Sequence, residues 1–413
     1  MGVPGMSGFV KELISRKEAI EYVSRALDFP WTLNTRAVPL QDAMGKRSGG
    51  NLLAPVDYPP FTRSTRDGYA LRSADVAGAS DSAPVFLRII GEVPMGEWTE
   101  KRIGEGECVL VHTGGMIPNE ADSVVMLEDT VQAGSWLEVR KALQSGENLV
   151  FRGEEIGQKD LLLKAGDLVG DRNVGILATL GICTVAIYDL KIGILSTGDE
   201  IVPAETPSLP PGKIRDANAW FLEFLLARHG FPAKRLGIVP DIRDRLADSV
   251  RGAMEENDIV VLSGGSSVSV RDFCSEIMET LPFPGLLVRG INMSPGKPAL
   301  IAGCRENRRL VLGLPGHPLS CSVVAISLLL PLLYRLAGIE SPLKKMEAVL
   351  AGDLFGKAGV EEFIPAILSD GEVLPMPGKS GYVSVLKEAN AFVRLAENEE
   401  TRRKGEKVEV LQW

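Results

Sequence analysis

Residues 257–269, NDIVVLSGGSSVS, constrain the fold of this chain more than any other stretch. The apolar run 259–262, rich in β-branched side chains, is typical of a strand buried on both faces of a parallel sheet. Two glycines and several hydroxyl residues follow at once. Glycine lets backbone N–H groups approach a ligand closely, so this loop suits an anion held by bare amides. A tight strand-to-helix turn carries the same signature, and the stretch alone leaves both interpretations open.

Strands and helices alternate along the chain around this stretch. The expected strands are 191–195, 234–239, 286–291, 299–302 and 310–312, and the expected helices are 216–229, 244–256 and 319–333. This alternation predicts a doubly wound α/β sheet, in which ligands bind beyond the carboxyl ends of the strands. The loops STGDE (196–200), Pro240-Asp241, SGGSS (263–267) and GLPGHP (313–318) would then meet at one edge.

The remaining segments predict further domains. Residues 15–27 carry a capping box and one apolar face, which indicates an amphipathic helix. Short β-like runs begin near residue 51, with 124–127 and 136–139 expected to pair as a hairpin. After residue 338 short runs recur, including 361–368, 381–385, 391–395 and 408–411.

We therefore expect a multidomain α/β plus β fold. The four expected domains are a discontinuous base (1–50 and 146–186), an inserted small β domain (51–145), a central doubly wound α/β domain (187–339) and a C-terminal β-barrel-like domain (340–413).

Composition narrows the class of function. The 413 residues have a net charge of −9 and no basic block, which argues against DNA or RNA binding. Five scattered cysteines without a CxxC pair suit a reducing compartment. No signal peptide is expected at the first residues, and the apolar stretch 319–333 is short for a membrane span. We expect a cytoplasmic protein that does not associate with membranes.

Acidic residues follow several of the expected strands. Glu200 and Asp241 end two strand loops, and Asp272 follows the glycine loop. Together they would suit a Mg²⁺ ion that keeps several waters and bridges a phosphate. Helix capping explains the acids of STGDE equally well, and solvated surface acids remain an alternative for the others.

Two candidate sites lie in the expected inserted domain. In PPFTRSTRDGYA, Asp67 occupies the tip of a turn, where it either caps the turn or reaches into a cleft. In VHTGGMIP, Thr113 and two glycines end a strand, as in an amide-lined loop or a plain hairpin bend.

Two rigid proline–glycine loops complete the candidates. PGKP contains Lys297, a point charge suited to a phosphate or other oxyanion. PGHP comprises Pro315, Gly316, His317 and Pro318. His317 could donate to an anion at the start of a helix, although a lone histidine is more often structural.

Taken in order, these segments resemble the molybdopterin molybdenumtransferase family, of the bacterial MoeA and gephyrin E-domain type. The matching segments are PPFTRSTRDGYA, HTGGMIPNEADSVV, STGDE, VVLSGGSS, PGKP, GLPGHPLS and SGYVSVLKEANAF. The resemblance implies a homodimer that binds adenylylated molybdopterin, inserts molybdate and releases AMP with Mg²⁺. It also implies a molybdopterin-adenylylating protein and apo-molybdoenzymes as partners.

The resemblance assigns roles residue by residue. Asp67 and Thr113 match the active cleft and would face the α/β domain of the other subunit; Glu200, Asp241 and Asp272 match the acidic cluster, as catalytic residues and metal ligands. The expected molybdopterin-binding residues are Ser196, Thr197, Gly198, Ser263, Gly264, Gly265, Ser267, Lys297, Pro315, Gly316, His317 and Pro318.

The chain also departs from the family pattern. Ser269 and Val270 replace a glycine and an acid, Ser294 replaces a lysine, and Glu155 and Arg66 replace an aspartate and a methionine. Fewer cations weaken the hold on an oxyanion. A carrier that binds molybdopterin or a nucleotide without inserting metal is therefore an alternative, as is a dimeric scaffold, and tungstate is an alternative oxyanion.

Overall fold

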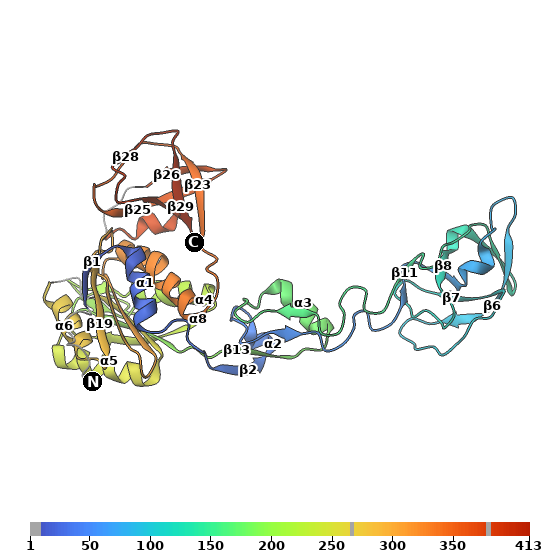
Figure 1. Ribbon diagram of the computed structural model, residues 1–413, viewed down its shortest axis with the longest axis horizontal. Helices are drawn as coiled ribbons and strands as arrows, with labels where there is room; N and C mark the ends of the chain where they lie inside the picture. The colour runs from blue at the N-terminus through green and yellow to red at the C-terminus, as the bar shows by residue number, and fades with distance from the viewer. Residues whose placement is uncertain (1–9, 265–267, 377–380) are drawn as a thin grey trace, which may run out of the picture. The chain divides into compact units, whose positions relative to one another are not determined.

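The structure is a computed structural model that describes residues 10–264, 268–376 and 381–413; for residues 268–272 and 344 it describes the backbone alone. The chain divides into two compact units. One comprises the described parts of Met1–Gly50, Ala165–Asp171 and Thr184–Trp413, and the other comprises Asn51–Lys164 and Arg172–Cys183. Figure 1 shows the course of the chain through both units.

A seven-stranded mixed sheet forms the centre of the first unit. Its strands, in spatial order, are β1 (Lys11–Ile14), β19 (Pro284–Ile291), β21 (Leu300–Cys304), β22 (Arg309–Leu314), β18 (Ile259–Gly264), β14 (Ile192–Thr197) and β17 (Ala233–Val239). Strand β21 is antiparallel to both neighbours, and the other pairs are parallel. The predicted α/β sheet is confirmed, and its central strand β18 is buried along Ile259–Ser263.

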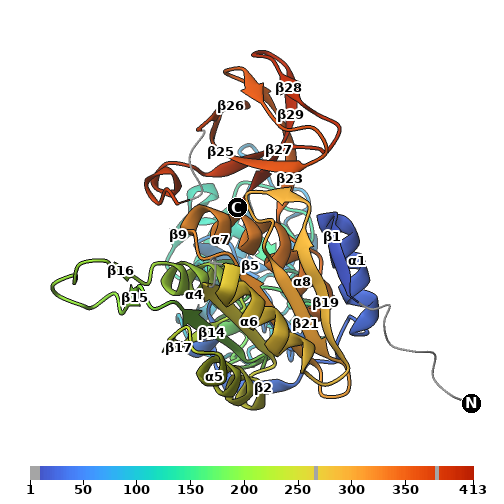
Figure 2. The same ribbon diagram turned by 90° about the vertical axis from the view of Figure 1, so that its left-hand side faces the viewer.

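Helices cover both faces of this sheet (Figure 2). On one face, α1 (Arg16–Ala26), α4 (Asn218–Arg228), α7 (Pro318–Val324) and α8 (Leu330–Ala337) bury the larger apolar core. On the other, α5 (Arg243–Glu256) and α6 (Val268–Glu279) pack on a second core. Burial of these apolar faces supplies the main driving force for folding of the domain.

The segment Pro318–Ala337 is the one helix, among the described residues, that is long and apolar enough to cross a membrane. Its most apolar window is 89% buried inside the structure. A π-helical turn, Ala325–Leu329, joins α7 to α8 within it. The segment thus serves as the predicted core helix.

A closed five-stranded barrel follows the sheet. It consists of β23 (Lys344–Leu350), β25 (Glu361–Ser369), β26 (Glu372–Pro375), β27 (Ala391–Leu395) and β29 (Lys407–Gln412), and pairing of β25 with β27 closes the ring. Strand β20 (Met293–Ser294) pairs with the outer edge of β25, and β24 (Leu354–Phe355) pairs with β28 (Thr401–Arg402). The predicted barrel-like C-terminal domain is confirmed. The expected strand at 381–385 is wrong, because Ser384–Lys387 forms a 3₁₀ turn.

Smaller elements complete the first unit. Strand β2 (Thr35–Pro39) pairs with β13 (Thr184–Tyr188) beside the short helix α2 (Leu40–Ala43), and β15 (Ile201–Val202) pairs with β16 (Ile214–Arg215). The buried Arg47 guanidinium donates to the carbonyl oxygens of His229 and Gly166 at 2.8 and 2.7 Å and to the Tyr334 hydroxyl at 3.0 Å. It thereby joins the segment after α2 to helices α4 and α8.

The second unit contains a six-stranded sheet. Its strands, in spatial order, are β8 (Ser123–Met126), β5 (Gly68–Leu71), β7 (Glu107–Val111), β6 (Val85–Val93), β10 (Trp136–Val139) and β9 (Thr130–Ala133). The unit also contains two short ladders, β3 (Leu52–Leu53) with β12 (Leu161–Leu163) and β4 (Arg63–Ser64) with β11 (Leu149–Val150). Most of α3 (Asp171–Thr179) also falls in this unit.

The hairpin predicted between 124–127 and 136–139 is wrong. Strand β10 pairs with β9 across Gly134 and Ser135, while β8 pairs with β5. The apolar run of β8 indicates a strand but carries no information on its partner. The inserted β domain itself is confirmed as a β structure, and the four predicted domain ranges stay a prediction.

Candidate functional site

Three loops meet at the carboxyl edge of the central sheet. The register places Ser196 beside Ser263 and Thr197 beside Gly264, and Ser263 beside Leu314 on the other side. The ends of β14, β18 and β22 are therefore adjacent, and they begin the loops STGDE, SGGSS and LPGHP. The strand ends from which the predicted loops begin are thus adjacent in the structure, while residues 265–267 of SGGSS lie outside the described residues.

Gly264 shows why the end of β18 requires a glycine. Its φ is +129°, and a Cβ atom built there would lie 1.9 Å from the Thr197 carbonyl oxygen. Any other residue would both strain the backbone and displace β14. The loop therefore begins where the backbones of β18 and β14 are in close contact. Gly265 and Ser267, further along this loop, lie outside the described residues.

Buried hydroxyls at the end of β14 anchor two carboxylates. The Ser196 hydroxyl donates to Asp216 Oδ2 at 2.6 Å, and the Thr197 hydroxyl donates to Asp241 Oδ1 at 2.7 Å. Both hydroxyl residues are at most 1% exposed. These bonds fix the two carboxylates at the sheet edge, because hydrogen bonds to charged acceptors are strong in a buried setting.

Asp216 and Asp199 also stabilise the loops around them. The Ala219 amide donates to Asp216 Oδ1 at 3.0 Å at the start of α4, and the Asp241 amide donates to Asp199 Oδ1 at 3.1 Å. Capping of α4 by Asp216 is the standard use of an acid at a helix start. Neither residue was predicted as a site residue, although Asp216 begins a predicted helix and Asp199 precedes the predicted Glu200.

The predicted acidic cluster is only partly described. Asp241 is placed at the edge, and Glu200 is exposed, with its backbone oxygen accepting from the Ile214 amide at 2.8 Å. The side chain of Asp272 lies outside the described residues. Within the described ranges, no group of three or more His, Cys, Asp or Glu side chains is arranged to hold a metal ion. The Mg²⁺ site stays a prediction.

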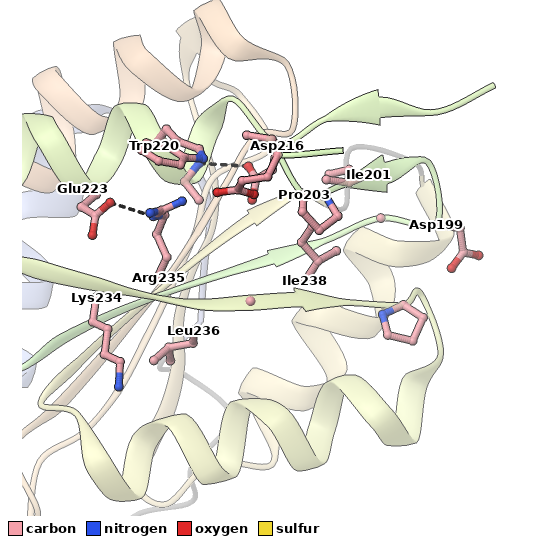
Figure 3. Close-up of a pocket in the computed structure, with 16 residues that line it drawn as sticks. Asp199, Ile201, Pro203, Asp216, Trp220, Glu223, Lys234, Arg235, Leu236 and Ile238 are labelled. Atoms are coloured by element: carbon pink, nitrogen blue, oxygen red, sulfur yellow. Dashed lines mark hydrogen bonds and ion pairs between the residues drawn. The ribbon is translucent and has the colours of Figure 1, made fainter. Parts of the chain in front are cut away.

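A cavity of about 830 Å³ opens beside Asp199 and Asp216, and the described residues that line it do not include the predicted acids Glu200 and Asp241 (Figure 3). Asp199, Asp216, Trp220, Glu223, Lys234 and Arg235 contribute its polar and aromatic lining. The Arg235 guanidinium lies 3.5 Å from the centre of the Trp220 ring and pairs with Glu223 at 2.7 Å. The cavity has the volume of a typical small-molecule pocket. Sequence reasoning missed Trp220 and Arg235, whose helical and strand positions look like ordinary surface positions.

The two proline–glycine loops lie at the same end of the sheet. Gly296 has φ +127°, and a Cβ there would meet Val324 at 2.6 Å, so the PGKP loop also requires its glycine. Lys297 is exposed. His317 is the N-cap residue of α7 and Pro318 its first residue, while the Asn218 side chain donates to the Gly316 oxygen at 2.8 Å. The bond from Asn218 connects α4 to the LPGHP loop, which contains Pro315 and Gly316.

Asp67 and Thr113 are in contact within the second unit. The Thr113 amide donates to Asp67 Oδ1 at 2.9 Å. That bond is the main reason why the pKa of Asp67 lies below its usual value, and His112 contributes as well. Asp67 therefore remains a carboxylate down to low pH, with 56% of its side chain exposed. The two predicted residues are thus assembled into one local cluster.

The departures from the family pattern occupy ordinary structural positions. Glu155 forms an ion pair with Arg63 at 2.9 Å. Ser294 lies on β20, in register with Glu362 of β25. Ser269 and Val270 lie in the first turn of α6, where only the backbone is described, and Arg66 is exposed beside Asp67.

Comparisons with known proteins cover the chain almost end to end. Residues 14–181 match the MoeA N-terminal region (domain I and II), 193–335 a probable molybdopterin binding domain, and 347–413 the MoeA C-terminal region (domain IV). A molybdopterin molybdenumtransferase of Bacillus subtilis is 31% identical over 95% of this chain and 93% of its own length.

Solved structures show the same similarity. Two solved structures, each of a molybdopterin biosynthesis MoeA protein from Pyrococcus horikoshii, match 97% of this chain, and 99% and 100% of their own chains. They match with TM-scores of 0.84 and 0.81 at 32% and 27% identity. The likeness extends over almost the whole chain.

Proposed function

The chain belongs to the MoeA family, and we propose that it is a molybdopterin molybdenumtransferase, which inserts molybdate into molybdopterin during molybdenum cofactor biosynthesis. The observation that supports this proposal is that the ends of β14, β18 and β22 are adjacent at one sheet edge, where Gly198 and Asp199 line a cavity of about 830 Å³. Such an edge is the usual ligand site of a doubly wound sheet.

The proposed substrate is adenylylated molybdopterin. The glycine-rich segment that follows β18 is the proposed phosphate-binding loop, since open backbone N–H groups suit anions. Once molybdate is bound, attack of a water oxygen on phosphorus breaks the phosphoanhydride bond and releases AMP, leaving the terminal phosphate on molybdopterin. The two thiols of molybdopterin then form two bonds to molybdenum, and one oxo group of molybdate leaves as water with their two protons. Amides aimed at the phosphate oxygens stabilise the charge that develops during this step. Pro315, Pro318 and Lys297 shape and charge the rest of the site.

Carboxylates at this edge are the proposed ligands of Mg²⁺. Asp241 and Asp199 offer the oxygen donors that this ion prefers, and Glu200 and Asp272 are the further predicted ligands. The ion would supply charge neutralisation on the phosphate oxygens. Asp241 and Asp199 also have a structural role. The bonds that they accept from Thr197 and from the Asp241 amide hold the loops after β14 and β17 together.

Asp67 and Thr113 are proposed to complete the site from the other subunit of a homodimer, where Asp67 positions molybdate. A molybdopterin-adenylylating protein as donor and apo-molybdoenzymes as acceptors are the proposed partners, in the cytoplasm. A competing function is that of a carrier that binds adenylylated molybdopterin without inserting metal; Ser294, which replaces a family lysine, is the observation that favours it.

Titration of the purified protein with adenylylated molybdopterin, followed by addition of molybdate and Mg²⁺, tests the proposal. A transferase converts the bound nucleotide to free AMP only after molybdate is added. Tight binding with no AMP on addition of molybdate would instead identify the carrier. Absence of binding would leave only the dimeric scaffold.

A further inference from the structure

A histidine lies between two carboxylates beside Asp67. His112, at the residue after β7, has Nε2 2.8 Å from Glu92 Oε1 and Nδ1 3.7 Å from Asp67 Oδ1. The three residues come from different segments: Glu92 from β6, His112 from the end of β7, and Asp67 from the turn before β5. We propose that His112 is a positioning residue for Asp67, and that its proton controls how strongly Asp67 repels an incoming oxyanion.

The hydrogen bond to Glu92 determines what the ring presents to Asp67. The Glu92 carboxylate only accepts, so the neutral ring carries its hydrogen on Nε2. Its Nδ1 lone pair then faces the Asp67 carboxylate across 3.7 Å. When Nδ1 takes a proton, the same geometry becomes an imidazolium placed between two carboxylates. Both states fit one arrangement of the backbone.

The surrounding contacts keep this arrangement in place. Asp67 Oδ1 already accepts from the Thr113 amide at 2.9 Å, and a Cβ at the adjacent Gly68 would lie 1.9 Å from the Val125 oxygen. Two further charged residues lie near this cluster: Lys101 donates from Nζ to the Glu92 carbonyl oxygen at 2.9 Å, and Arg66 is exposed beside Asp67. The turn bearing Asp67 therefore has little freedom to rotate away from His112.

This inference rests on the proposed function, in which molybdate binds beside Asp67. Molybdate is an anion, and a bare carboxylate at its binding site opposes its approach. The family lysine replaced here by Ser294 removes one source of positive charge. A protonated His112 supplies a cation that offsets Asp67, while the hydrogen bond from Thr113 keeps the carboxylate aimed. Molybdate should therefore bind better when His112 is protonated.

The test measures the apparent KM for molybdate and kcat of the full-length protein between pH 6 and pH 8. The assay couples AMP release to activation of an apo-molybdoenzyme, and compares wild type with His112→Gln and His112→Arg. Glutamine keeps a donor for Glu92 but takes no proton, whereas arginine is a permanent cation. The wild-type KM should rise by about fivefold between pH 6 and pH 8.

In His112→Gln the KM should stay near the wild-type value at pH 8 across the whole range, with kcat changed less than KM. In His112→Arg it should stay near the wild-type value at pH 6. A wild type that inserts molybdate, with a KM profile that His112→Gln leaves unchanged, would overturn this inference and leave the proposed function standing. A wild type that releases no AMP and activates no enzyme at any pH would overturn the proposed function, and this inference with it.

Discussion

The Thr197 hydroxyl donates a 2.7 Å hydrogen bond to Asp241 Oδ1 and joins the end of β14 to the loop after β17. The bond links two strands that are neighbours in the sheet but lie more than forty positions apart in sequence. It explains how a fold with parallel strands brings separate acidic loops into one site.

Replacing Thr197 with valine should lower the stability of the carboxyl edge of the central sheet. Valine keeps the shape of the buried side chain but removes the donor to Asp241, at a cost of about 1 kcal/mol in the free energy of unfolding. Affinity for adenylylated molybdopterin should fall along with it. Denaturant unfolding and ligand titration of the same variant check both effects, and unchanged affinity would show that the Asp241 position is irrelevant to binding.

Replacing Gly264 with alanine should be severe. The new Cβ would lie 1.9 Å from the Thr197 oxygen, at a φ that alanine avoids. The matched control is Gly252→Ala in helix α5, where a Cβ would meet nothing within 4 Å and helix propensity favours alanine by about 1 kcal/mol. Thermal unfolding should show a marked loss for the first and a small gain for the second. Equal melting temperatures would contradict the close packing of β14 and β18.

Asp67→Asn should leave the fold intact and strongly reduce the rate of molybdenum insertion, because the carboxylate that positions bound molybdate is lost, even though molybdate meets less repulsion on binding. The side chain is 56% exposed, and asparagine still accepts from the Thr113 amide, so only the charge is lost. Thermal unfolding supplies the control for folding, and activation of an apo-molybdoenzyme supplies the activity. If insertion proceeds at the wild-type rate, Asp67 has no part in the mechanism.

Glu361→Gln should destabilise the first unit. Glu361 is 4% exposed and receives bonds from Arg16 at 2.7 Å and Arg394 at 2.6 Å, which join α1 to the barrel. Removing one charge from a buried ionic group leaves the others unpaired and costs about 3 kcal/mol. Denaturant unfolding at pH 7 measures it, and a cost near zero would mean that the arginines find other partners.

The same residue gives a pH dependence. Burial alone would raise the pKa of Glu361, but the two arginines outweigh it, and the pKa lies below the ordinary value. The ionised form therefore stabilises the fold above the unfolded-state pKa of about 4.3. That stabilisation is lost as the pH falls below 4.3 through the folded-state pKa. The stability difference between wild type and Glu361→Gln should accordingly shrink in acid, as unfolding at pH 3 and pH 7 would show.

The central sheet and its loop edge were predictable because each strand carries its own local signal. The apolar run of β18 and the Gly-Gly after it need no knowledge of distant residues. Strand β1 was missed for the opposite reason: its sequence, KELI, is mostly exposed, and only parallel pairing with β19, far along the chain, makes it a strand. Pairing across such a separation leaves no trace in a local pattern.

The residues of the candidate site also fall into a group that local sequence predicts and a group that it does not. Loops that end buried strands were predicted, whereas Asp216, Trp220 and Arg235 act through neighbours that only the folded chain supplies. The hairpin error has the same origin, since β8 and β10 each look like strands while their partners are set by the whole sheet. Glycines that no other residue can replace, such as Gly264, were the most informative residues for predicting the site.

The most direct test of the account follows AMP release and apo-molybdoenzyme activation together, using the wild-type protein, adenylylated molybdopterin, Mg²⁺ and micromolar molybdate. The account predicts that both signals appear with the same time course and that both require molybdate. Tight binding of the substrate with neither signal would contradict the transferase and identify a carrier, for which the edge residues describe binding alone.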